Sequence, residues 1–153
     1  MGVSQQFCTF LLEGNLFGVP VPQVQEVIRF HEMTSVPLAP EVVEGIINLR
    51  GQIVIAIDLR RRLALSGRPD GAVPMNVVVR TSDGAVSLLV DEIGDVIEVD
   101  ERTYEPPPET MKGMAGELIR GVHKLPERLL LVLDTERAVE VGQPAATLPE
   151  KEI

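Results

Sequence analysis

An internal repeat is the feature of this sequence that most restricts its possible folds. Residues 45–63 (GIINLRGQIVIAIDLRRRL) align without gaps with residues 121–139 (GVHKLPERLLLVLDTERAV), an offset of 76 positions, 121 minus 45. The identical pairs are Gly45 with Gly121, Leu49 with Leu125, Asp58 with Asp134 and Arg61 with Arg137. Matches of Gly, Asp and Arg in one order are hard to obtain by chance in a Val-rich chain, so the pattern indicates a duplicated structural unit.

The repeat continues upstream at a shorter spacing of 69 positions, 93 minus 24. The aligned pairs there are Val21 with Val90, Val24 with Ile93, Glu26 with Asp95, Val27 with Val96, Ile28 with Ile97 and Pro37 with Pro106. An insertion of seven residues, 76 minus 69, around 109–116 (ETMKGMAG) accounts for the difference. The sequence therefore predicts two similar units, at 10–72 and 76–141, with residues near the termini able to complete the first. Each is too small to bury a large core alone, so we expect them to pack together around a binding groove.

Short apolar segments and turn residues favour a mostly β fold. The aliphatic residues Val, Ile and Leu must form the core, because the chain has four Phe, one Tyr and no Trp; the β-branched members of that set favour strands. Glycine-containing breaks such as EGN at 13–15 and SDG at 82–84 are typical of hairpin turns. Two short helices are predicted, beginning at the N-capping residues Asp58 and Asp134. The tail at 142–153 has no periodic pattern and is expected to be flexible.

The charge and cysteine content restrict the partners and the compartment. The formal net charge of −9 repels phosphate backbones and anionic lipid headgroups, so nucleic acid and direct membrane insertion are not expected. No apolar run approaches the roughly 20 residues that span a bilayer. The single cysteine, Cys8, can form no internal disulfide, and the N-terminus lacks the pattern of a signal peptide. These features predict a cytoplasmic protein.

Residues with catalytic or metal-binding chemistry form no recognisable motif in the sequence. Dinucleotide, phosphate-loop, CxxC and HExxH patterns are all absent, and we expect no catalytic residue, metal or cofactor. Cys8 is interpreted as a buried thiol, and His31 and His123 as surface or loop imidazoles. The cluster at 60–62 (RRR) is expected to project from a short helix into water, the alternative being an acidic partner.

Glu26 and Arg50 are charged residues flanked by apolar sequence. A charge in such surroundings is costly unless it lies at a rim or finds an opposite partner. The second copy has Asp95 at the Glu26 position but Pro126 at the Arg50 position. The repeated fold therefore does not require the arginine, which favours a role specific to the first unit. We hypothesise that Glu26 and Arg50 meet near a binding surface, with Gly51 allowing a turn or a close approach; the alternative is a solvent-exposed hairpin tip.

Four stretches of the chain together resemble the CheW family of bacterial chemotaxis coupling proteins. They are QFCTFLLEGNLFGVPVPQVQEVIRF, VPLAPEVVEGIINLRGQIVIAIDLRRRL, SLLVDEIGDVIEV and GVHKLPERLLLVLDTERAV, within residues 6–141, and INLRGQIVIAIDLR is the most specific motif. The resemblance implies two tandem SH3-like five-stranded β-barrels and no enzymatic activity. It further implies an adaptor of two-component signal transduction that links the signalling tips of chemoreceptors to the regulatory domain of the histidine kinase CheA, recruited through these partners to membrane-associated receptor arrays.

The same resemblance suggests where each partner binds. Transferred to the matching positions, the receptor-binding residues are Val24, Glu26, Val27, Arg50 and Gly51. The kinase is expected on the second barrel, at residues that the motifs do not identify. The alternatives are a coupler for twitching motility or another non-flagellar array, an OB- or SH3-like nucleic-acid-binding barrel, and a small β-barrel enzyme that uses dispersed carboxylates.

Overall fold

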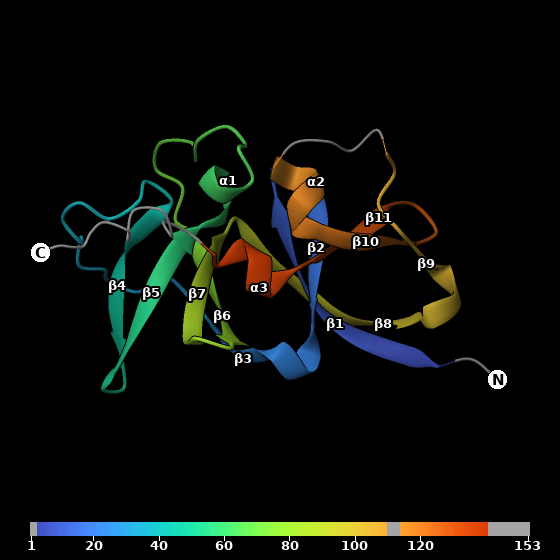
Figure 1. Cartoon of the computed structure of the whole chain (residues 1–153), viewed down its shortest axis with the longest axis horizontal. Coiled ribbons are helices and arrows are strands. Elements are labelled where there is room, and N and C mark those ends of the chain that lie inside the picture. The colour runs from blue at the N-terminus through green and yellow to red at the C-terminus, as the bar shows by residue number, and fades with distance from the viewer. Residues whose placement is uncertain (1–2, 110–113, 141–153) are drawn as a thin grey trace, which may run out of the picture.

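Two β-sheets lie side by side along the long axis of the molecule (Figure 1). The computed structural model describes residues 3–109 and 114–140. The six-stranded sheet has the order β8–β1–β2–β11–β10–β9. Its strands are β1 (Ser4–Leu12), β2 (Asn15–Pro20), β8 (Glu92–Asp100), β9 (Tyr104–Glu105), β10 (Ile119–Lys124) and β11 (Leu129–Leu133).

The other sheet has five strands, in the order β3–β6–β7–β5–β4. They are β3 (Val24–Ile28), β4 (Val43–Leu49), β5 (Gln52–Asp58), β6 (Met75–Thr81) and β7 (Gly84–Val90). The described helices are all short: α1 (Leu59–Arg62), α2 (Met114–Leu118), α3 (Thr135–Ala138), and the 3-10 turns η1 (Val21–Gln23) and η2 (Glu101–Thr103). The mostly β class is confirmed, and within the described part of the chain no helix has the length and apolarity to cross a bilayer.

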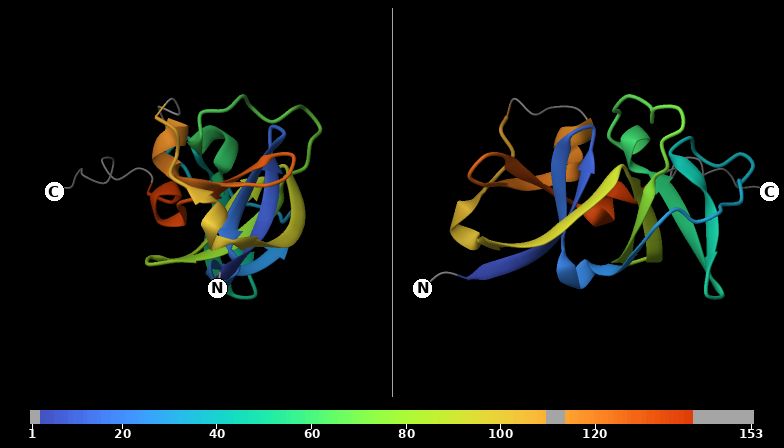
Figure 2. Two further views of the ribbon diagram at one scale, coloured as in Figure 1. Left: turned by 90° about the vertical axis from the view of Figure 1, so that its right-hand side faces the viewer. Right: turned by 180° about the vertical axis from the view of Figure 1, so that it is seen from behind.

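The two repeats exchange their first hairpins (Figure 2). Each repeat runs hairpin, strand, hairpin, helix: β1–β2, β3, β4–β5, α1, and then β6–β7, β8, β10–β11, α3. The β1–β2 hairpin pairs with β8 and, in parallel, with β11, whereas β6–β7 pairs with β3 and, in parallel, with β5. Each sheet therefore contains strands from both sequence units, 10–72 and 76–141. The boundaries of the sheets thus differ from the boundaries of the units. A repeat shows which segments share a local structure, but not which copy completes which sheet.

The sixth strand of the larger sheet is a small addition to the five predicted. Strand β9 pairs only with Val122 and His123 of β10. Its counterpart beside β4 is a single bridge between Thr34 and Ile46. The edge segment is thus present in both copies, but only one forms enough hydrogen bonds to count as a strand.

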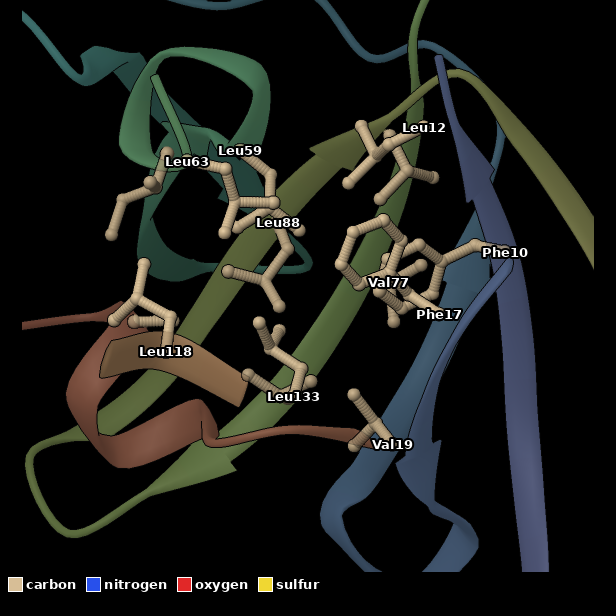
Figure 3. Close-up of a cluster of buried hydrophobic side chains, with 14 of the residues drawn as sticks. Phe10, Leu12, Phe17, Val19, Leu59, Leu63, Val77, Leu88, Leu118 and Leu133 are labelled. Atoms are coloured by element: carbon tan, nitrogen blue, oxygen red, sulfur yellow. The ribbon is translucent and has the colours of Figure 1, made fainter. Parts of the chain in front are cut away.

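The largest hydrophobic core lies between the sheets and includes side chains from both (Figure 3). From the six-stranded side come Phe10, Leu12, Phe17, Val19, Leu118 and Leu133, and from the five-stranded side Leu59, Leu63, Val77 and Leu88. Two smaller clusters lie within the individual sheets, one around Phe7 and Leu130 and one around Ile47 and Val54. The shared core confirms that the two halves pack against each other and makes them dependent on each other for stability.

The glycines and aspartates of the repeat have equivalent structural roles. Gly45 and Gly121 each flank a register shift, in the β4–β5 and β10–β11 pairs. A Cβ on Gly45 would lie 2.7 Å from the backbone oxygen of Thr34, so this position requires the absence of a side chain. A Cβ on Gly121 would lie 2.4 Å from the end of the Tyr104 side chain, which would have to move. Asp58 caps α1 and Asp134 caps α3 through side-chain bonds to backbone N–H groups, which confirms both predicted helix starts.

The arginines of α1 correct the expectation that this cluster projects into water. Arg60 is buried and forms a bidentate pair with Asp91, with Nε–Oδ1 at 2.8 Å and Nη2–Oδ2 at 2.7 Å. Arg62 donates to the carbonyls of Arg137 at 2.8 Å and Ala138 at 2.9 Å, at the end of α3. Only Arg61 has a largely exposed side chain, at 48%. Two of the three arginines therefore join the repeats instead of facing solvent. They do so because α1 packs against segments that are distant in the sequence.

The predicted tail at 142–153 and residues 110–113 of the 109–116 insertion lie outside the described residues. Residues 114–116 of that insertion belong to α2, whose Leu118 is part of the shared core.

Candidate protein-binding site

Arg50 and Gly51 form the tip of the β4–β5 hairpin. The strands pair Leu49 with Gln52, which leaves a two-residue turn. Both turn residues have positive φ, 53° at Arg50 and 88° at Gly51, as in a type I′ turn. The Gly51 N–H donates to Asn48 Oδ1 at 2.8 Å. Glycine suits this conformation, whereas arginine adopts it at a cost, so backbone preference does not explain the arginine.

Glu26 lies on β3 and forms an ion pair with Arg50. The Arg50 side chain is 68% exposed and that of Glu26 is 22% exposed. Arg50 is therefore at an exposed hairpin tip and also meets Glu26, whereas the role of the pair in binding stays a prediction. Strand β3 is at one edge of the five-stranded sheet and β4 at the other, so the pair closes a curved sheet upon itself.

The predicted site residues Val24 and Val27 lie on β3, the same strand as Glu26. The ladder between β3 and β6 shifts register between Val24 and Glu26. Val24 packs against the core between the sheets, whereas Val27 is 40% exposed. The five predicted residues thus lie on β3 and at the tip of the β4–β5 hairpin, with Glu26 and Arg50 in contact and Val24 turned toward the core. We call Val24, Glu26, Val27, Arg50 and Gly51 the β3–hairpin patch.

Three exposed apolar side chains near this patch were not predicted as surface residues. Phe30 is 52% exposed just after β3, and Ile53 and Ile55 of β5 are 62% and 45% exposed. The two isoleucines line an open hollow of about 420 Å³ with Val86 and Val139. The run QIVIAID is apolar on both faces, so its sequence has no alternation from which the outward face could be identified.

The titratable residues differ in part from their predicted environments. His31 lies in a loop, as expected, but His123 is 2% exposed on β10, so its interpretation as a surface or loop residue is wrong. Cys8 is only half-buried, and partial burial raises the pKa of its thiol. Among the described residues, no three His, Cys, Asp or Glu side chains lie close enough together to hold a metal ion. The ion-paired patch with exposed apolar neighbours is suited to binding a protein.

Comparison with known proteins identifies the family. The family model for the CheW-like domain matches residues 6–142. The chain is 31% identical over 143 residues to the chemotaxis protein CheW of Klebsiella aerogenes, covering 94% of this chain and 86% of that protein. It is 32% identical over 138 residues to the chemotaxis protein CheW of Treponema pallidum, covering 86% of this chain and 80% of that one.

The solved structures agree with the sequence matches. The scaffolding protein TtCheW of Thermoanaerobacter tengcongensis superposes with a TM-score of 0.83 at 29% identity, covering 91% of this chain and 94% of that one. Family model, relatives and fold all support the resemblance recognised in the sequence. The chain therefore belongs to the CheW-like family, whose members are chemotaxis scaffolds and not enzymes.

Proposed function

We propose that this protein couples the cytoplasmic signalling tips of chemoreceptors to the histidine kinase CheA. The observation that carries the proposal is the meeting of Glu26, on the edge strand β3, with the exposed Arg50 at the tip of the β4–β5 hairpin, whose strand β4 is the opposite edge of the sheet. In this role the protein acts in the cytoplasm and reaches receptor arrays through its partners.

The β3–hairpin patch is the proposed receptor site. Val27 offers apolar surface beside the Glu26–Arg50 pair. A helical hairpin presents apolar side chains at helical spacing with charges beside them, and such a partner is bound by an apolar strip with charged margins. The apolar contacts would supply most of the affinity, and the ion pair would fix the orientation.

The six-stranded sheet is the proposed site for the regulatory domain of the kinase. It contains the strands β8–β11 of the second repeat, and it presents exposed apolar side chains at Val96 (57%), Leu129 (48%) and Tyr104 (44%). Placing the two partners on different sheets would let both bind at once, as a coupler requires.

A pull-down with a receptor signalling tip and a CheA regulatory domain tests the proposal. Wild type is expected to retain both partners, and Arg50→Ala to lose the receptor while keeping the kinase domain. Arg128→Ala is the matched control, because it removes an exposed arginine from the corresponding hairpin of the second repeat. Failure of wild type to bind either partner would overturn the coupler assignment, and equal receptor binding by Arg50→Ala would overturn the site.

Arg50→Asn separates binding from folding at the same position. Asparagine tolerates positive φ better than arginine does, so this variant should keep or slightly raise the melting temperature while losing receptor binding. The charge exchange Glu26→Arg with Arg50→Glu then tests direct pairing. Recovery of binding that each single variant has lost supports it, and no recovery counts against it.

A further inference from the structure

A pocket in the six-stranded sheet, outside the β3–hairpin patch, has the features of a small-molecule site. It has a volume of about 310 Å³. Its walls include the buried residues Phe7, Val132 and His123, together with the half-exposed ring of Tyr104. The His123 ring lies 5.5 Å from the Phe7 ring and 5.3 Å from the Tyr104 ring, between centroids. The sole tyrosine of the chain is thus part of an aromatic enclosure around a buried histidine.

The contacts of His123 favour one tautomer. Thr103 Oγ1 lies 2.9 Å from the carbonyl oxygen of Asp100, to which it can donate its single proton. When Thr103 donates there, it accepts in its 2.8 Å contact with His123 Nδ1, an arrangement that places the ring hydrogen on Nδ1. The other ring nitrogen, Nε2, is left with a lone pair. Burial also lowers the pKa of His123, which favours the neutral ring.

Nε2 of His123 is open to a ligand. It has no hydrogen-bond partner in the part of the chain that the structure describes. The one buried side-chain oxygen or nitrogen left without a partner there is Glu44 Oε1, so Nε2 is not sealed inside the protein. Since His123 lines the pocket, the accessible acceptor belongs to that pocket.

The repeat shows that the fold itself does not require a histidine at this position. The offset of 76 positions equates His123 with Ile47, 123 minus 47, and the strand pairing agrees, because Ile47 lies opposite Val54 and His123 opposite Leu130. Ile47 is 2% exposed and packs in the core of the five-stranded sheet. The first repeat therefore has an aliphatic side chain, Ile47, at this position, whereas the second has the polar ring of His123 beside the pocket.

The rim restricts the charge of a ligand. Arg120 and Glu101 both line the pocket and are exposed, so one positive and one negative group face any molecule that enters. A ligand with net charge would be attracted by one and repelled by the other. The aromatic walls favour a flat ring, and the lone pair on Nε2 requires a donor.

We propose that this pocket binds a small, uncharged aromatic molecule bearing an O–H or N–H group, whose hydrogen bond His123 Nε2 accepts. Phenol and indole are the simplest probes of this chemistry. Anisole and 1-methylindole are their matched controls, because each keeps the ring but lacks the donor.

Titration of the full ¹⁵N-labelled chain, followed by amide chemical shifts, tests the proposal. Phenol should cause saturable chemical-shift changes in the amides around Tyr104, Arg120 and His123. It should bind about fivefold more tightly than anisole, the difference expected for one hydrogen bond. His123→Ile, which copies the residue of the first repeat, should remove this preference, whereas the control His31→Ile should keep it. Equal binding of phenol and anisole to wild type, shifts centred elsewhere, or no saturable shift would overturn the proposal.

A second measurement needs no variant and so does not depend on how His123→Ile folds. Long-range ¹H–¹⁵N correlation of the imidazole identifies which ring nitrogen is protonated. The free protein should show hydrogen on Nδ1, and phenol, but not anisole, should shift the Nε2 resonance. Hydrogen on Nε2 in the free protein, or an Nε2 resonance that phenol leaves unmoved, would contradict the assignment.

Discussion

At the scale of single residues, the glycines and capping aspartates shared by the two repeats have structural roles, whereas two residues that differ between the repeats belong to the proposed sites. Gly45 and Gly121 are kept because an edge segment crosses directly over each. Arg50 and His123 are not kept: their counterparts are Pro126 and Ile47. Comparison of the two copies identified Arg50 as a candidate binding residue from the sequence. It did not identify His123, because a single histidine in the sequence does not indicate that its side chain is buried.

Gly45→Ala should destabilise the protein by about 1–3 kcal/mol, the usual cost of overpacking. The new Cβ would lie 2.7 Å from the backbone oxygen of Thr34, which cannot move aside as a flexible side chain could. Gly67→Ala is the control, because Gly67 has no atom within 4 Å of the added Cβ and should change stability by less than about 0.5 kcal/mol. Urea unfolding measures both. Equal effects of the two variants would show that close approach is not the reason for this glycine.

At the scale of the elements, α1 connects the two repeats through buried or capping arginines. Arg60 holds Asp91, at the end of β7, and Arg62 caps the last carbonyls of α3. The position of α1 after Asp58 follows from the sequence, because N-capping is a local effect. Asp91 lies 31 residues beyond Arg60, and Arg137 lies 75 residues beyond Arg62, so no local pattern identifies either partner.

Asp91→Asn should cost about 3–5 kcal/mol near neutral pH, because it removes the bidentate carboxylate of the buried Arg60 and leaves only the more distant Glu13, at 3.9 Å. The hydrogen bond from Arg60, followed by that from the backbone N–H of Glu13, lowers the pKa of Asp91 below its ordinary value of 3.8. This stabilisation is complete above pH 3.8 and is lost as pH falls through the lower, folded-state pKa.

Urea unfolding at a series of pH values checks this prediction. The free-energy difference between wild type and Asp91→Asn should be constant above about pH 5 and shrink in strong acid. The exposed Asp70, changed to Asn, is the control and should have little effect throughout. A difference between wild type and Asp91→Asn that grows on acidification would refute the role of the pair.

Arg62→Ala should destabilise the protein by about 1.5–3 kcal/mol, since it removes charged hydrogen bonds to the carbonyls at the end of α3. Arg61→Ala, on the same helix, should cost less than about 1 kcal/mol because that side chain is half exposed. Thermal unfolding of both variants gives the comparison. The reverse order of stabilities would mean that α1 does not tie the repeats together through Arg62.

At the scale of the whole molecule, hairpin exchange and a shared core predict one cooperative unfolding transition. The strands of the five-stranded sheet are contiguous in sequence, from β3 to β7, whereas residues 10–72 lack β6 and β7. A fragment of residues 21–90 should therefore show more strand signal by circular dichroism than a fragment of residues 10–72. It should also self-associate, because the core-facing valines of β6 and β7 lose their cover.

The opposite order of strand content would mean that the repeats fold as units before they exchange hairpins. Calorimetry of the full chain supplies the second check. Two separated transitions would contradict the dependence of each sheet on the other.

The sequence by itself determined the duplication, the mostly β class, the two aspartate caps and the family. Each of these depends on residues close together in the chain or on a pattern repeated along it. Only the tertiary structure decided which hairpin completes which sheet, that Glu26 reaches Arg50, that Arg60 and Arg62 face inward, and that His123 is enclosed by aromatic rings. These features depend on contacts between distant segments, and the energy of such contacts is fixed by packing, which local sequence does not specify.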